Sequence, residues 1–146
     1  MGCLRVKPGV LFAQIAPAGF RLLGALERAA RGVPGDVTIT CGTDSHAETD
    51  PHTRGEAYDV RTHDLSENDK RYLLREVLIG VQENVDDAPK DASIGLATRY
   101  FYGQLEHPGE AGEHLHVQIR KGKTWPPTTR RINRNLYPRR HKRDKR

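Results

Sequence analysis

Two short stretches, about 60 residues apart, restrict most strongly how this chain can fold. Residues 52–59 read His-Thr-Arg-Gly-Glu-Ala-Tyr-Asp, and residues 113–116 read Glu-His-Leu-His. Imidazole and carboxylate groups both suit Zn²⁺, and a catalytic zinc ion keeps three protein ligands and one water. If both stretches serve one ion, the fold has to bring these distant segments side by side.

The first stretch is predicted to end in a strand over residues 57–61. On that strand Gly55, Ala57 and Asp59 share one face, and the two small residues leave room beside the carboxylate for a metal and a substrate. His52 precedes the strand, so the intervening turn can bring its imidazole back over Asp59. The alternative interpretation is a surface loop with an incidental histidine and aspartate.

The second stretch supplies two imidazoles and a carboxylate. His114 and His116 are two residues apart on a predicted strand, so both side chains point to the same side. Glu113 adds a carboxylate where that strand begins. A glutamate beside a zinc-bound water can take its proton and later pass it to the leaving amine.

Hydrophobic periodicity predicts an α+β fold. Apolar residues recur at helical spacing from Pro17 to Gly32, and again after a candidate N-cap at Ser66 until residues 83–85. Further stretches have the composition of strands, at residues 37–41, 57–61, 96–105 and 115–119. This order favours two main helices packed on a mainly antiparallel sheet.

Charge separates the chain into a body and a tail. Residues 120–146 hold twelve of the 24 Lys and Arg and one of the 19 acidic residues, whereas the body is mildly acidic. We expect one domain over residues 1–123 and a basic, unstructured tail over residues 124–146. Such a tail either solvates the C-terminus or attracts polyanions, which would be nucleic acid or acidic polymers of a bacterial wall.

Other classes are disfavoured by composition. Cys3 and Cys41 are too few for a disulfide framework or a cysteine-type zinc site. Cys41 could approach the metal from the end of its strand, but a small buried side chain is the more common use of such a residue. No apolar run is long enough to cross a membrane. Residues 10–20 only loosely imitate a signal peptide, so the localisation stays open. We expect a monomer.

The pattern His-x-x-Gly-x-Ala-x-Asp, followed by Glu-x-x-His and His-x-His, resembles the zinc D-Ala-D-Ala carboxypeptidase family. That family shares its fold with lysostaphin-type endopeptidases and the Hedgehog signalling domain. The resemblance runs from about residue 10 to residue 120, and this form of the domain resembles small phage-encoded members of the family. It implies His52, Asp59 and His116 as ligands of one zinc ion, Glu113 as general base and His114 beside the oxyanion.

The chain also departs from that family. Many relatives carry Ser-Gly-Tyr-Arg after the first strand, and the arginine helps to hold the substrate. Residues 41–44 are Cys-Gly-Thr-Asp here, so this arginine is missing, and Arg54 or Arg61 is our candidate to replace it.

The resemblance implies a zinc peptidase that hydrolyses peptidoglycan stem peptides, as a D-Ala-D-Ala carboxypeptidase or a phage endolysin. One alternative is a zinc-binding wall or virion domain with little or no turnover. Another is nucleic-acid binding through the basic tail.

Overall fold

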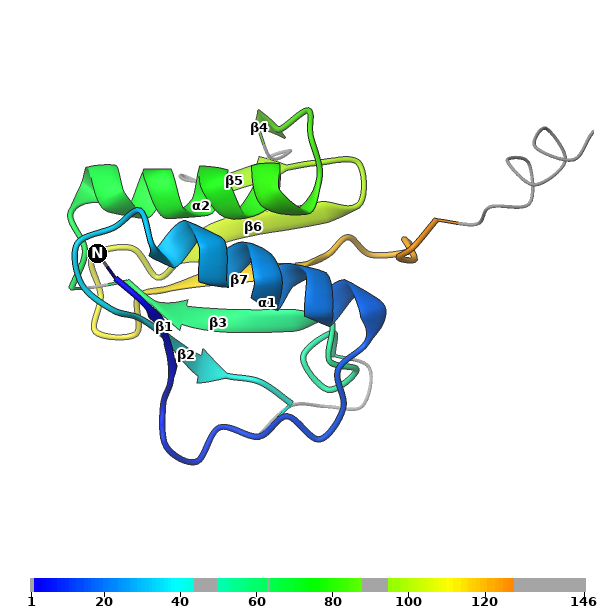
Figure 1. The fold of residues 1–146 in the computed structure, drawn as a ribbon, viewed down its shortest axis with the longest axis horizontal. Helices are drawn as coiled ribbons and strands as arrows, with labels where there is room; N and C mark the ends of the chain where they lie inside the picture. Colours follow the sequence, from blue (N-terminus) through cyan, green and yellow to red (C-terminus); the bar gives the residue numbers. More distant parts are fainter. Residues whose placement is uncertain (1, 44–49, 63, 88–94, 128–146) are drawn as a thin grey trace, which may run out of the picture.

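The computed structural model describes residues 2–43, 50–62, 64–87 and 95–127, which form one sheet with two helices on one of its faces (Figure 1). The helices are α1 (Pro17–Ala30) and α2 (Glu67–Val81), which pack against each other. The predicted α+β class, with two helices on a mostly antiparallel sheet, is confirmed. Neither helix of the described part is long and apolar enough to span a membrane.

The sheet has the strand order β1-β2-β3-β7-β6-β5-β4, and only the β1–β2 pair is parallel among the described strands. The seven strands are β1 (Leu4–Val6), β2 (Val37–Cys41), β3 (Ala57–Arg61), β4 (Asp86–Asp87), β5 (Gly95–Ala97), β6 (Phe101–Glu106) and β7 (His114–Ile119). Strands β3 and β7, which carry the two stretches singled out in the sequence, are therefore neighbours at the centre of the sheet.

Both helices begin as the sequence predicts. Pro17 stands in the first turn of α1, where its missing amide hydrogen has no cost. The Ser66 hydroxyl accepts the Asp69 amide at 3.1 Å and so caps α2. Helix α2 ends at Val81, earlier than predicted, because the backbone turns extended at Gln82 and left-handed at Asn84 (φ 64°).

The predicted strand over residues 96–105 is wrong in one respect, because a tight turn divides it into β5 and β6. The Thr98 amide donates to the Phe101 carbonyl at 2.8 Å, and the Thr98 hydroxyl accepts the Phe101 amide at 2.9 Å. Strands β1 and β4 were not predicted, since two or three residues are too few to show an alternating pattern.

The core lies between the helices and the sheet, and β7 shows how the two faces differ. Leu115, Val117 and Ile119 are buried among residues of that core. His114 and His116 alternate with them and therefore lie on the opposite face, which the helices leave uncovered. The fold thus directs the imidazoles of this strand to the open face.

Trp125 extends the core beyond the predicted domain limit. Its ring lies 5.2 Å from that of Phe101 and 5.7 Å from that of Tyr100, and the Arg21 guanidinium lies 4.6 Å from its centre. This differs from the prediction that packing ends at residue 123. The remainder of the predicted tail, residues 128–146, lies outside the described residues.

Candidate metal centre

Strand pairing places Asp59 and His116 together. They are directly opposite each other in the antiparallel register of β3 and β7, so their side chains are neighbours on the open face. The His116 Nδ1 atom lies 2.9 Å from Asp59 Oδ1. Two of the three predicted ligands therefore meet as a direct result of sheet register.

A turn before β3 brings His52 to the same place. The Gly55 amide donates to the His52 carbonyl at 2.9 Å, and the Asp50 carboxylate accepts the His52 amide at 2.8 Å. Gly55 has φ 71°, and a Cβ atom there would lie 2.3 Å from the Gln14 carbonyl oxygen. Glycine is needed at this position for its backbone conformation and for space.

The three predicted ligand atoms form a compact triangle. His52 Nε2 lies 3.2 Å from Asp59 Oδ1 and 3.2 Å from His116 Nδ1, and the third side is the 2.9 Å contact. Zinc bonds of about 2.0–2.1 Å in tetrahedral geometry place two ligand atoms about 3.3 Å apart. The spacing of this triangle fits three ligands of one ion.

Gln118 fixes which nitrogen of His116 faces the triangle. The Gln118 amide nitrogen donates to the Ile119 carbonyl at 2.8 Å, so its Oε1 atom is the one that faces His116 Nε2 at 2.6 Å. Nε2 must then carry the hydrogen. This leaves Nδ1 with the lone pair in the neutral ring, as a metal ligand requires, and it matches the hydrogen-bonded support that ligating histidines usually have.

Proton affinities reflect the same cluster. Burial lowers the pKa of His116, but hydrogen bonds to Asp59 and Gln118 outweigh it, and the pKa is raised above its ordinary value. Burial raises the pKa of Asp59, but hydrogen bonds from His116 and His52 bring it well below its ordinary value. In the absence of a metal, the cluster thus favours a proton shared between Asp59 and His116.

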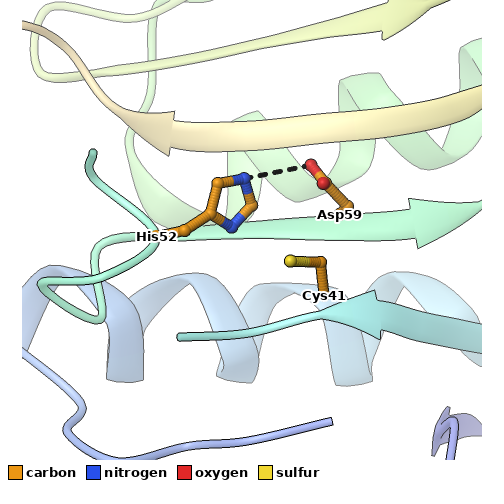
Figure 2. A group of neighbouring side chains, drawn as sticks. All are labelled: Cys41, His52 and Asp59. Atoms are coloured by element: carbon orange, nitrogen blue, oxygen red, sulfur yellow. Dashed lines mark ion pairs between the residues drawn. The ribbon is translucent and has the colours of Figure 1, made fainter. Parts of the chain in front are cut away.

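Cys41 lies beside this triangle, at the end of β2. Figure 2 shows its side chain on the same side of the sheet as His52 and Asp59. Its sulfur and one ligand atom from each of those residues all lie within 4.8 Å of one another, so these three side chains could hold a metal ion. The sequence left two uses open for Cys41, a small buried position and an approach to the metal. Its side chain is partly exposed and lies near two of the candidate ligands.

Two further groups border the triangle. His114 Nε2 lies 3.7 Å from Asp59 Oδ1 and 3.3 Å from Glu106 Oε1, and Glu106 Oε1 lies 3.5 Å from His116 Nδ1. His114 was predicted to line the site, whereas Glu106 was not among the candidates. The register that pairs Glu106 with His114 across β6 and β7 brings it there.

Glu113, the predicted base, lies elsewhere. Both of its carboxylate oxygens accept from Lys70 Nζ of α2, at 2.8 and 3.0 Å, and only 4% of the Glu113 side chain is exposed. Hydrogen bonding to Glu113 raises the pKa of Lys70. The structure therefore places Glu113 against α2 and does not bring it to the triangle.

The two arginines predicted to bind substrate differ in position. Arg61 is exposed and forms an ion pair with Asp64 at 3.0 Å. Arg54 forms an ion pair with Glu56 at 2.7 Å and lines a pocket of about 570 Å³. Other side chains that line this pocket include Gln118, Arg120, Lys121 and Lys123. None of the three triangle residues lines this pocket, but Gln118, which contacts His116, does.

No protein-family model, curated protein or solved structure matches this chain.

Proposed function

We propose that this protein is a zinc-dependent peptidase that hydrolyses peptidoglycan stem peptides, with the Hedgehog and D-Ala-D-Ala peptidase type of fold. The triangle of His52 Nε2, Asp59 Oδ1 and His116 Nδ1, with sides of 2.9–3.2 Å, carries this proposal. Three protein ligands with an open side are typical of catalytic zinc sites, whereas structural zinc sites are closed by a fourth protein ligand.

A bound zinc ion would polarise the scissile carbonyl and a water molecule. The residues of the chain set the charge of such a site. Two neutral imidazoles and the Asp59 carboxylate bring one negative charge, which leaves net positive potential for a tetrahedral oxyanion. With one ion bound, His114 and Glu106 are the described groups at the open side that can exchange a proton with the water. Glu113 could do so only by leaving Lys70.

The pocket that Arg54 and Gln118 line suits an acidic substrate. Arg120, Lys121 and Lys123 line it together with the Arg54–Glu56 ion pair, so cationic groups are in excess. Peptidoglycan stem peptides carry free carboxylates, which such a lining attracts. Gln118 lines this pocket and also accepts from His116, so a peptide bound there would lie next to the metal ligands.

Digestion of purified muropeptides by the full-length, zinc-loaded chain tests the proposal. We expect release of D-alanine or of cleaved stem peptides, loss of this activity with a chelator, and its return with zinc. The Asp59→Asn variant should lose zinc and at least about 100-fold of the activity, because it removes one of three ligands. Asp64→Asn is the matched control, since Asp64 is exposed and its ion pair among the described residues is with Arg61. A zinc-loaded chain that cleaves no muropeptide would refute the proposal.

Cys41 favours one alternative, a zinc-binding domain without turnover. If its thiolate is a fourth ligand, the site is closed and no position remains for water. Cobalt substitution distinguishes the two, because a thiolate ligand gives a sulfur-to-cobalt charge-transfer band that Cys41→Ser would abolish. The peptidase proposal expects no such band and full activity in Cys41→Ser.

A further inference from the structure

A second group of metal-ligating side chains shares Asp59 with the triangle. Asp59, Glu106 and His114 each offer one ligand atom, and these atoms lie within 4.8 Å of one another. The three residues stand on the adjacent strands β3, β6 and β7, so the sheet itself fixes their spacing. In the proposed single-zinc site, His114 and Glu106 would only exchange a proton with the water, and this role does not require them to face Asp59.

The orientation of His114 resembles that of a metal ligand. Its Nδ1 atom lies 2.8 Å from the Gly112 carbonyl oxygen, which can only accept, so Nδ1 carries the hydrogen. In the neutral ring the lone pair of Nε2 then faces Glu106 Oε1 at 3.3 Å and Asp59 Oδ1 at 3.7 Å. A backbone carbonyl that fixes one ring nitrogen while the other faces carboxylates is the usual support of a ligating histidine.

These lone pairs repel one another unless a proton or a metal cation lies between them. The described part of the chain contains no lysine or arginine that forms an ion pair with Asp59 or Glu106; their ion-pair contacts there are with imidazoles. Glu113, in contrast, has its own lysine. No lysine or arginine of the described residues therefore explains the arrangement of the second group, which leaves a proton or a metal ion.

We propose that Asp59, Glu106 and His114 bind a second divalent cation, with Asp59 bridging it to the zinc ion of the triangle. This inference rests on the proposed function, because the two sites share Asp59. One imidazole and two carboxylates suit Zn²⁺, Co²⁺ or Mn²⁺. The second site is the weaker one, since its atoms are more widely spaced and 23% of His114 and 31% of Glu106 are exposed.

The second ion would change the role of two residues. With one ion bound, His114 and Glu106 can accept a proton from the water. With two ions bound, their lone pairs would serve as ligands, and the second cation would supply the charge that favours ionisation of the water. Paired ions about 3.5–4 Å apart are known to clamp both reacting oxygens in hydrolytic sites.

Metal titration of the metal-free, full-length chain tests this site without any substrate. Zn²⁺ binding is measured by calorimetry and by elemental analysis after dialysis, and Co²⁺ binding by visible absorption. We expect two equivalents per chain, the second at least tenfold weaker than the first. Glu106→Gln should keep the first equivalent within about threefold and lose the second, because a neutral amide is a poor replacement for the carboxylate. The control Glu110→Gln removes an exposed carboxylate near His107 and should keep both equivalents.

The outcomes separate the two proposals. A wild-type chain that saturates at one equivalent, or a Glu106→Gln variant that still binds two, refutes the second site. If one equivalent binds and muropeptides are cleaved, the second site fails and the proposed peptidase stands. If two equivalents bind and no muropeptide is cleaved, the second site stands and the proposed function fails.

Discussion

The carboxylates on the two faces of the sheet have different partners. On the helix side, Glu113 and Lys70 are almost fully buried and neutralise each other through two short contacts. On the open side, Asp59 and Glu106 meet only imidazoles among the described residues that form ion pairs with them. A carboxylate with its own lysine is part of the architecture, whereas carboxylates grouped with histidines form a site that attracts a cation.

Breaking the pair on the helix side gives the largest expected effect. Lys70→Met leaves the Glu113 carboxylate buried and unpaired, and we expect a loss of about 3–5 kcal/mol in the free energy of unfolding. Zinc affinity of the folded protein should not change, because neither residue touches the triangle. Chemical denaturation and zinc calorimetry measure the two quantities.

The matched double variant Lys70→Met/Glu113→Leu should recover much of that loss in the free energy of unfolding, since it removes both charges.

The Glu113→Gln variant tests the role of general base that the sequence predicted for Glu113. If Glu113→Gln reduces hydrolysis about 100-fold or more while stability and zinc content are retained, Glu113 is the base after all, and the difference between the faces does not hold.

On the open side, the largest effect without loss of a ligand is expected at Gln118. In Gln118→Leu the His116 Nε2–H loses its acceptor, so the ring is no longer held with Nδ1 toward Asp59. Loss of such support typically lowers metal affinity by about 10–100-fold. Gln104→Leu is the control, since Gln104 pairs with His116 across β6 and β7, but among the described contacts its side chain forms no hydrogen bond with the imidazole. Equal zinc affinity in the two variants would contradict the assigned tautomer.

The sequence predicted what depends on local pattern. Periodicity and capping predicted that one helix begins at Pro17, that Ser66 caps the other, and where the central strands lie. The spacing of the motif indicated His52, Asp59 and His116 as a group. The structure brings those three together, and their role as ligands stays a prediction. Spacing could not supply what depends on pairing between strands.

Glu106, Gln118 and Lys70 illustrate this limit. Glu106 reaches the site because β6 pairs with β7 in one register, and a shift by one residue would turn its side chain to the helix face. The Lys70–Glu113 contact joins residues 43 positions apart, which no local pattern reveals. A signal for Glu106 did exist, because Tyr102, Gln104 and Glu106 alternate with buried residues on β6.

Acidification should weaken zinc binding on the open side by a moderate amount. The pKa of His116 is raised in the metal-free protein, and zinc has to displace that proton from Nδ1. Below this raised pKa we expect zinc affinity to fall about tenfold per pH unit for each proton displaced. Calorimetry in buffers of different ionisation enthalpy counts the protons, and zinc binding that releases none at acidic pH would exclude His116 as a ligand.

The stability of the metal-free protein should follow the same two groups. The raised pKa of His116 stabilises the fold below the unfolded value near 6.5, and this contribution is lost as pH rises through the raised value. The lowered pKa of Asp59 contributes stability above its unfolded value near 3.8, which is lost as pH falls. As pH rises through the raised pKa of His116, the metal-free protein should therefore become less stable while its zinc affinity increases.

The smallest effect is expected from shortening the C-terminus. Truncation after residue 127 keeps Trp125 and every candidate ligand, so the free energy of unfolding should change by no more than about 0.5 kcal/mol, and zinc content should be unchanged. Truncation after residue 123 removes the Trp125 ring that packs on Phe101 and under Arg21. It should lower the free energy of unfolding by about 1–3 kcal/mol and leave the open face unchanged.

Truncation after residue 127 also tests the nucleic-acid alternative. If it abolishes salt-sensitive DNA binding in a protein that never cleaved muropeptides, the basic segment carries the function, and the open face is only a metal-binding accessory.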